Sequence, residues 1–569
     1  MSIFQKIFFD PKHRKRGLIL AFTIFGISVS VITGTFVYQL TNPIQTFPKF
    51  KTHADIPVQP ITTFADSTYV DFPNDTNMVS NSSCAIQGTN WIADENNKVG
   101  IDMHESDWQQ LDLKSAKGSA LWLNKTSVSC GDQVEIHASL YGQTSDPKNN
   151  KRTFHALRVG WYNGAGARQL WESKEIALKS QKILRPKSNL RMVDTKWPVS
   201  VKFEVGNDWT PGLYLIASEN KDGAIENVAP LIVRAPFGTS HILLMHSFLT
   251  WNLYNSFGNR SAYFGAGEDV VSRRDDRSRV VSFDRPIVGS GGYSIHRDGI
   301  SMVQFLEKNG FNYDQVSDLD IDSKPSLLNS YNELVLAGHV EYMTRRIFES
   351  IISARNHGIN LAIFGGNTAL WQTRLTESPV GPNRRIIMYR KATEDPVSDP
   401  RQITIEFADK RLNIPQTLFT GTLPSGTHVF GNYKAFKIPK WLKLASNSAV
   451  TGISPDSEIE AIAPKSAASP PNINVMFSGQ MTYADPSTKP AGMNLHPEAD
   501  VIWFTNPYGQ ATFNAGLTTW ACDLIDTCAY STVDEKSRTV LDQITKSVLT
   551  LWQDRGVGDR KSTRLNSSH

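Results

Sequence analysis

Short runs of alternating apolar and polar residues dominate the chain between residues 84 and 236. Such runs at 133–140, 157–162 and 213–218 are separated by Gly, Pro and Asn, and long helical patterns are absent there. A period of two places alternate side chains on one buried face, which is typical of strands in packed sheets. The pattern predicts a β-sandwich domain over residues 84–236.

After residue 236 the pattern changes to apolar runs that alternate with amphipathic stretches. Apolar runs at 241–247, 332–338, 360–366 and 384–390 predict four strands, and stretches at 297–311 and 344–358 predict helices that end at a glycine. Strands that alternate with helices are the signature of a doubly wound α/β sheet. We therefore expect such a domain, with a glutamine-amidotransferase-like strand order, over residues 237–552.

The N-terminal segment contains 24 consecutive residues, 17–40, without a charged side chain. This length is sufficient for a helix to cross about 30 Å of hydrocarbon. Four basic residues lie between positions 12 and 16, which predicts that residues 1–16 stay in the cytosol and that the main body is exported, to the periplasm or the extracellular space. A cleaved signal peptide is the alternative, although its apolar core is normally shorter. Residues 41–83 are expected to form a linker.

Composition and cysteine content narrow the classes of function. With 40% hydrophobic and 20% charged residues the chain is globular, and its net charge of +4 comes with no basic stripe for nucleic acid. Four cysteines fit an oxidising compartment. Of the three pairings we favour Cys84 with Cys130 and Cys522 with Cys528, because each pair then stays inside one domain. Free buried thiols are the alternative.

Polar residues follow the ends of the predicted α/β strands, where open α/β sheets bind ligands. Tyr254 lies beyond the first strand, His339 and Glu341 beyond the middle one, and Asn367 beyond the third. A carboxylate in such a crevice can ligate a metal or transfer a proton. Each residue also has an ordinary interpretation: Asn367 as the N-cap of a helix that starts at residue 368, His339 as a structural imidazole, and Tyr254 as a packing residue.

Missing motifs narrow the chemistry further. The sequence contains no P-loop, no HExxH zinc motif, no nucleophile elbow and no dinucleotide fingerprint. The nucleophilic cysteine of the glutamine amidotransferases is also absent, because no cysteine lies between Cys130 and Cys522. Metal-assisted chemistry or a protein without catalysis remain.

Several blocks of the sequence resemble the N,N-dimethylformamidase large-subunit family. TWNLYN at 250–255, VSFDRP at 281–286, AGHVEY at 337–342 and NLAIFGGNTALWQTRL at 360–375 follow the family order, and the similarity extends from about Glu95 to Trp552. The resemblance implies a mononuclear ferric ion, held by two tyrosine phenolates and one glutamate, that activates water to hydrolyse a small amide. Phenolate and carboxylate are hard oxygen donors, and such donors suit Fe³⁺ better than do the sulfur and imidazole ligands that are typical of zinc and copper sites.

Carried over residue by residue, the resemblance assigns Glu341 as the carboxylate ligand and Tyr254 as one phenolate. Tyr293 is the expected second phenolate, and Tyr263 is an open alternative. His339 and Asn367 match polar residues beside the metal. His339 or a second carboxylate would handle the proton of the departing amine.

Together these features predict a membrane-anchored, exported, iron-dependent amide hydrolase. Its expected substrate is a small amide or one derived from the cell envelope. A surface binding or structural protein on an inactive fold is the alternative. Active enzymes of the family assemble from more than one chain, so a homo-oligomer is one expectation.

The last residues of the chain differ in character from the rest. Residues 560–569, RKSTRLNSSH, are polar and unpatterned, and they follow the last predicted helix at 537–552. They look like a vector or adapter translation. We expect residues 553–569 to be disordered and dispensable for folding and activity.

Overall fold

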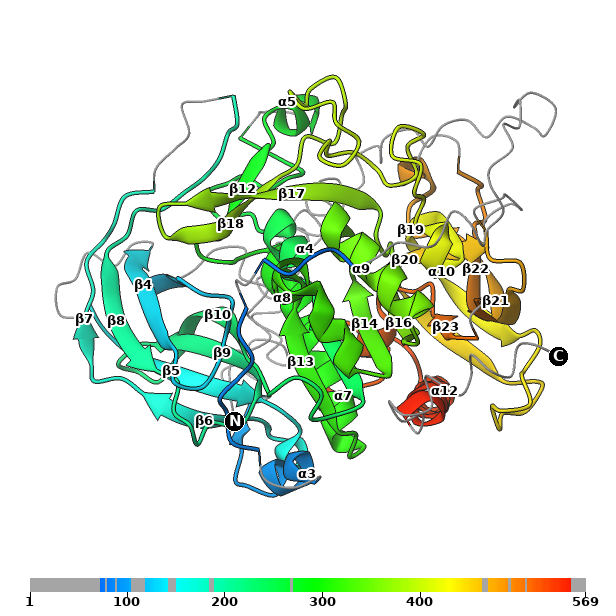
Figure 1. Cartoon of the computed structure of the whole chain (residues 1–569), viewed down its shortest axis with the longest axis horizontal. Coiled ribbons are helices and arrows are strands. Elements are labelled where there is room, and N and C mark those ends of the chain that lie inside the picture. The colour runs from blue at the N-terminus through cyan, green and yellow to red at the C-terminus, as the bar shows by residue number, and fades with distance from the viewer. Residues whose placement is uncertain are drawn as a thin grey trace, which may run out of the picture.

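The computed structural model describes residues 72–76, 79–86, 90–103, 118–141, 150–183, 189–266, 270–462, 469–489, 493–506 and 509–553. The predicted cytosolic segment 1–16, the predicted membrane helix 17–40, most of the predicted linker and the predicted tail from residue 554 lie outside these residues. Among the helices of the described ranges, none combines the length and apolar character needed to cross a membrane. The described part of the chain is mixed α/β and mostly β (Figure 1).

The predicted β-region forms two sheets with a common core (Figure 1). One sheet has the order β1 (Ile101–Asp102), β6 (Gly166–Glu172), β5 (Lys151–Val159), β9 (Gly212–Glu219), β10 (Ile225–Val233) and β3 (Ser127–Val128), with β7 (Ile176–Ala177) paired to β5. The other contains β2 (Gly118–Leu123), β4 (Gln133–Tyr141) and β8 (Val199–Glu204). Side chains of both sheets, among them Ile136, Tyr214 and Leu231, fill the core between them. This packing follows from the period-two pattern of the strands.

A nine-stranded sheet forms the centre of the region after residue 236. Its parallel half has the order β13 (Tyr313–Ser317), β11 (Ile242–His246), β14 (Glu333–His339), β16 (Asn360–Gly366) and β23 (Ala511–Asn514). Its antiparallel half continues with β22 (Glu498–Thr505), β21 (Asn474–Tyr483), β19 (Thr422–Ala435) and β20 (Ala449–Ile462). The strands predicted at 241–247, 332–338 and 360–366 are confirmed as β11, β14 and β16.

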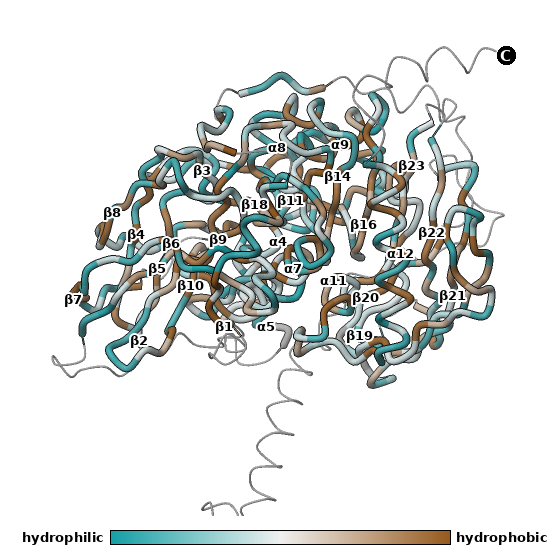
Figure 2. Tube along the Cα trace, turned by 90° about the horizontal axis from the view of Figure 1, so that it is seen from below, coloured by the Kyte–Doolittle hydropathy of each residue, from teal (hydrophilic) through white to brown (hydrophobic). Residues whose placement is uncertain are grey.

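The central strands of this sheet are buried on both faces. Every residue of β14 and β16 is buried, and Figure 2 shows hydrophobic stretches along both strands. Near-continuous apolar runs are typical of parallel strands that are covered on both sides. The sheet therefore gives a rigid support to whatever follows the ends of these two strands.

The strand predicted at 384–390 is present in part, over residues 384–387, but it does not join this sheet, so its predicted placement was wrong. Its residues contribute to β18 (Gly381–Ile387), which belongs to a four-stranded sheet with β12 (Val280–Ser282), β17 (Trp371–Ser378) and β15 (Tyr342–Thr344). A tight turn joins β17 to β18, so the chain reverses direction and the pair is antiparallel. Strand β17 also occupies the place of the helix that one interpretation of Asn367 required.

Helices cover the sheet. The stretch predicted at 297–311 begins as a π-helical turn, Ile295–Ile300, and continues as α7 (Ser301–Lys308), and the stretch at 344–358 forms α9 (Arg345–Asn356). The last helix, α12 (Glu535–Gln553), packs against β14, β16 and β20. The shorter helices are α3 (Trp91–Asn96), α4 (Phe248–Tyr254), α5 (Val270–Asp275), α6 (Ser290–Ser294), α8 (Asp318–Ser323), α10 (Thr417–Thr420) and α11 (Trp520–Asp523). Short 3₁₀ turns cover Tyr162–Gly164, Pro325–Ser330 and Pro486–Thr488.

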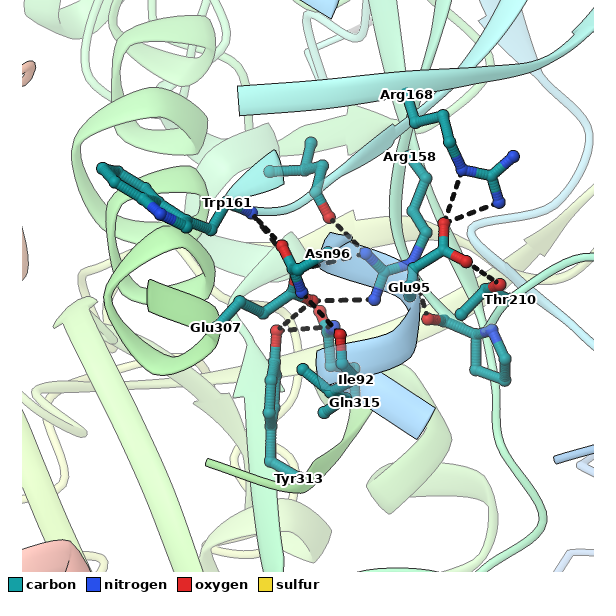
Figure 3. Close-up of polar contacts among 12 residues, drawn as sticks. Ile92, Glu95, Asn96, Arg158, Trp161, Arg168, Thr210, Glu307, Tyr313 and Gln315 are labelled. Carbon is teal, nitrogen blue, oxygen red and sulfur yellow. Dashed lines mark hydrogen bonds and ion pairs between the residues drawn. The ribbon is translucent and has the colours of Figure 1, made fainter. Parts of the chain in front are cut away.

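A buried polar cluster joins the β-region to the α/β region, and we call it the interdomain cluster (Figure 3). It comprises Glu95, Asn96, Arg158, Arg168, Glu307 and Tyr313. Arg158 on β5 donates to Glu307 on α7 with an Nη2–Oε1 distance of 2.7 Å, and both side chains are 0% exposed. Tyr313 on β13 donates to the same carboxylate. The cluster therefore fixes the two regions to each other, over an apolar core that is continuous between them.

Both predicted disulfides are present. Cys84 is bonded to Cys130, and Cys522 is bonded to Cys528. The first bond ties the start of the β-region to the turn that follows β3, and the second ties α11 to the loop after it. Each bond therefore lies within one region of the molecule, as expected.

Candidate active site

The predicted site residues come from the ends of neighbouring elements. His339 is the last residue of β14, Glu341 follows two positions later, and Asn367 follows β16 directly. Tyr254 is the last residue of α4, which follows β11. Because β11, β14 and β16 are adjacent parallel strands, their carboxyl ends bring these four residues to one edge of the sheet.

Two glycines allow the strand ends to approach one another. A Cβ atom on Gly365 would lie 1.9 Å from the Gly338 carbonyl oxygen, and one on Gly338, at φ 68°, would lie 2.1 Å from the Asp298 carboxyl carbon. Asp298 Oδ2 in turn accepts a hydrogen bond of 3.1 Å from the backbone amide of His339. The close packing of backbone and carboxylate thus sets the position of His339.

Three side-chain oxygens meet at the centre of the site, and we call Tyr254, Tyr263 and Glu341 the oxygen cluster. The Tyr254 hydroxyl lies 2.7 Å from Glu341 Oε2 and 2.7 Å from the Tyr263 hydroxyl. The Tyr263 hydroxyl lies 2.6 Å from the same Glu341 oxygen. Three separate segments of the chain therefore direct one oxygen each to a common point.

A second group of side chains holds the oxygen cluster in place. Trp371 Nε1 donates to Glu341 Oε1 at 3.1 Å, and the backbone amide of Trp371 donates to the Glu341 carbonyl at 3.0 Å. The Tyr342 hydroxyl donates to the Tyr263 hydroxyl at 2.6 Å, and Arg390 donates to the Tyr342 hydroxyl. Strand β17 thus supports the cluster through Trp371, and the segment after β18 supports it through Arg390.

The other side of the site contains a second carboxylate, Glu458. His339 Nε2 lies 3.2 Å from Glu458 Oε2 and 3.5 Å from Glu341 Oε2, so the imidazole stands between the two acids. The Asn367 side-chain amide donates to Glu458 Oε2. Glu458 comes from β20. The sequence predicted that a second carboxylate could take part, but no pattern in the sequence identified Glu458 as that residue.

The turn that carries Asn367 is fixed by another carboxylate of β20. Asn367 has φ 51° and Ala369 has φ 54°, both in the left-handed region that non-glycine residues seldom adopt. Glu460 Oε1 accepts a hydrogen bond of 3.1 Å from the Thr368 amide inside this turn. Strand β20 therefore places Glu458 in the site and holds the turn from which Asn367 reaches it.

Burial dominates the electrostatics of the site. Desolvation raises the pKa of Glu341, although Arg390 and the hydrogen bonds from Tyr263 and Tyr254 oppose it. Desolvation and the nearby Glu341 charge raise the pKa of Glu458 to about 8. Desolvation also lowers the pKa of His339 well below its usual range, so the imidazole is neutral at pH 7. Acids and phenols here hold their protons more tightly than in water.

Solvent exposure differs among the residues of the site. Glu341 and His339 are each 4% exposed, whereas Tyr254 and Tyr263 are only partly buried and the Glu458 side chain is 19% exposed. The partly exposed side chains of the site are therefore those of the two tyrosines and Glu458.

Tyr263, the open alternative for the second phenolate, lies in the oxygen cluster. Tyr293 packs instead against Tyr530, with ring centroids 4.3 Å apart, and the Arg297 guanidinium lies 5.1 Å from its ring centroid. Tyr263 follows Tyr254 by nine residues, and the loop between them is held by Arg285, which donates to the carbonyls of Asn255, Phe257 and Arg260. Spacing alone did not distinguish the two tyrosines.

The donor set of the oxygen cluster fits a hard cation. Within the described ranges, no group of three or more His, Cys, Asp or Glu side chains has the arrangement of a metal site. The oxygen cluster is of another kind, with two phenol oxygens and one carboxylate. Such oxygens suit trivalent iron, and a cation there would favour the ionised phenols that burial alone disfavours.

Comparison with known proteins places this geometry in a family. The model of the N,N-dimethylformamidase beta subunit-like, C-terminal family matches residues 153–531. The matched range includes the oxygen cluster, His339, Asn367 and Glu458. The chain has no match among the curated proteins.

Proposed function

Because the chain belongs to the N,N-dimethylformamidase beta subunit-like family, we propose that it is an iron-dependent amide hydrolase. Tyr254, Tyr263 and Glu341 would hold a mononuclear ferric ion. The observation that carries the proposal is the convergence of their three oxygens within 2.6–2.7 Å of one another. In this proposal Tyr263 takes the ligand role first expected for Tyr293.

Each member of the site has a task that fits its surroundings. A bound ferric ion would polarise the amide carbonyl and acidify water. In its ionised form Glu458 takes the proton of the attacking water, because its side chain is partly exposed and burial makes it a stronger base than an exposed acid. The same carboxyl then gives that proton to the departing amine. His339, neutral between the two acids, orients water and substrate by hydrogen bonding.

Asn367 and Trp371 complete this division of tasks. The Asn367 amide holds the Glu458 carboxylate in the direction of His339, so that the base stays aimed at the oxygen cluster. The Trp371 indole donates to Glu341 Oε1, which the Tyr263 hydroxyl also contacts at 2.8 Å, and Glu341 Oε2 faces both tyrosines. Both are positioning residues, because each acts through a carboxylate.

We propose an amide substrate that is small or derived from the cell envelope, and an exported enzyme body anchored by the helix predicted at 17–40. Two disulfides support the second proposal, because such bonds persist in oxidising compartments. Fractionation of cells that express the full chain would test it. Recovery in the membrane fraction, with the body cleaved by protease added from outside, is expected, and a protected cytosolic body would contradict the proposal.

Metal content and amide hydrolysis test the proposed function together. Purified protein should contain about one iron per chain and show a visible phenolate-to-iron charge-transfer band, and it should release amine from at least one member of a panel of small and cell-wall-derived amides. Protein without iron or band would contradict the metal site. Iron with no hydrolysis of any amide would favour a binding or structural protein on an inactive site.

A further inference from the structure

Arg390 lies over the oxygen cluster without belonging to it. It follows β18 by three residues, and its backbone amide donates to the Thr404 carbonyl at 3.0 Å. Its guanidinium carbon lies 3.8 Å from the ring centroid of Tyr263, 4.8 Å from that of Trp371 and 5.6 Å from that of Tyr342. One cation therefore contacts the rings of three residues that hydrogen-bond to the cluster or belong to it.

The guanidinium is also connected to the cluster by hydrogen bonds. Arg390 donates to the Tyr342 hydroxyl, and that hydroxyl donates to the Tyr263 hydroxyl at 2.6 Å. Trp371, on the same guanidinium, donates to Glu341. Arg390 thus contacts the ring of Tyr263 directly and is linked to the Tyr263 hydroxyl through the Tyr342 hydroxyl.

The backbone at this position has an uncommon conformation. Arg390 has φ 66°, which is unfavourable for a non-glycine residue and persists only where the surroundings fix it. A glycine would relieve this cost but would remove the cation. The conformation directs a long side chain from the end of β18 back across the site.

We propose that Arg390 is a positioning residue that holds the Tyr263 oxygen toward Glu341 and withdraws electron density from the Tyr263 ring. This inference rests on the proposed ferric site. A cation on the face of an aromatic ring is attracted by the ring quadrupole, and its field stabilises the ring electrons. Lysine cannot replace this guanidinium fully, because stacking on two rings while donating to a phenol needs a planar fork of donors.

Two substitutions of Arg390 distinguish the effect of its positive charge from the effect of its planar contacts. Arg390→Met removes the cation and keeps an apolar chain, and Arg390→Lys keeps the charge and loses the planar contacts. Arg374→Lys is a matched control on the neighbouring strand β17. The Arg374 guanidinium carbon lies 5.8 Å from the Tyr389 ring centroid, and its Nη1 atom lies 2.8 Å from Asp395 Oδ2. All three proteins are made as the full chain, and their unfolding midpoints are compared first.

The readouts are ferric affinity by chelator competition and the energy of the charge-transfer band. Arg390→Met should bind iron roughly 10–100-fold more weakly, as for other residues that orient metal ligands. Its band should move to longer wavelength, because the phenolate electrons lose a stabilising charge. Arg390→Lys should lose affinity with a smaller shift of the band, and the Arg374→Lys control should match the parent in both readouts.

Two results would overturn the inference in distinguishable ways. A parent protein that binds iron with a normal band, beside an Arg390→Met protein with the same affinity and band, would overturn the role of Arg390 and leave the proposed function intact. A parent without iron or band would overturn the proposed function and this inference with it.

Discussion

Glutamate, tyrosine and arginine are buried together in two places of this molecule, with opposite outcomes. In the interdomain cluster, arginines touch both carboxylates directly: Arg158 contacts Glu307 at 2.7 Å, and Arg168 contacts Glu95 at 2.6 Å. In the candidate active site, the hydrogen bonds to the Glu341 carboxylate come, among the described residues, from neutral hydroxyl and indole groups. The same residue types are charge-balanced in one cluster and short of cations in the other.

The pKa values express this difference. Burial raises the pKa of Glu95, but Arg158, Lys98, Thr210 and Arg168 outweigh it and lower that pKa to about 2. Burial and a neighbouring acid raise the pKa of Glu458 to about 8. A balanced cluster connects parts of a fold, whereas a cluster with excess oxygen donors is one to which a cation can add stability.

The largest expected effect concerns the balanced cluster. Arg158→Met should lower the free energy of unfolding by about 3–5 kcal/mol, because it leaves Glu307 buried without its cation. Urea unfolding followed by fluorescence measures this. The double variant Arg158→Met/Glu307→Gln should recover part of the loss. Folded Arg158→Met protein should bind iron as the parent does. Weaker iron binding by this folded protein would contradict the separation between a cluster that stabilises the fold and a cluster that binds metal.

The next effect concerns the unbalanced cluster. Glu341→Gln should reduce ferric affinity at least about 100-fold, because a neutral amide replaces the anionic donor, and it should change the unfolding midpoint little. Iron content after purification with a chelator wash measures this. Glu349→Gln is the control, because Glu349 is also buried but pairs with Arg345 at 2.7 Å. Retention of full iron by Glu341→Gln would show that this acid is no ligand.

A comparison of two tyrosines tests which of them belongs to the oxygen cluster. Tyr263→Phe should lose roughly 10–100-fold in iron affinity and change the charge-transfer band, because it removes one of the three converging oxygens. Tyr293→Phe should keep both, because Tyr293 packs on Tyr530. The reverse result would return the second ligand role to Tyr293.

Asp523, outside the oxygen cluster, tests whether a buried carboxylate that is held by hydroxyl groups makes stability depend on pH. Its carboxylate accepts from Thr519 and Ser531, each at 2.8 Å, and burial raises its pKa to about 6. The folded state therefore binds this proton more tightly than the unfolded state, so the contribution of Asp523 is fully present below pH 4 and is lost as pH rises to about 6. We expect this loss to be on the order of 1–3 kcal/mol.

Asp523→Asn removes the titrating group and should remove this part of the pH dependence. Unfolding free energies of the parent and the variant, measured at pH 4 and pH 7, provide the test. The variant should gain relative to the parent at pH 7. Equal pH dependence in the two proteins would contradict the assignment.

The parallel strands and half of the site could be predicted from the sequence. Strands β11, β14 and β16 are short apolar runs, and the residues after them had to lie at one edge because parallel strands share their direction. This rule was sufficient to bring together Tyr254, His339, Glu341 and Asn367. It depends only on order along the chain and on burial.

The rest depends on contacts between distant segments. Glu458 lies on an antiparallel strand without a distinctive pattern, and 91 residues separate it from its partner Asn367. Tyr263 reaches the cluster because Arg285 fixes the intervening loop through three carbonyls. Strand β18 was assigned to the wrong sheet because an apolar run does not reveal its partner, and its hairpin with β17 decided the pairing.

The late position of Glu458 has a consequence for the order of events during synthesis. When the ribosome has synthesised β18, it has already made Tyr254, Tyr263 and Glu341, but not β20 or β23. Strand β23 pairs with β16 beside the site. The incomplete chain would therefore carry the three proposed ligands while the sheet lacks its fifth parallel strand. If the proposed function is right, productive loading with metal is expected to wait until most of the chain is made, and a chain cut before residue 458 would have the proposed ligands without the proposed base.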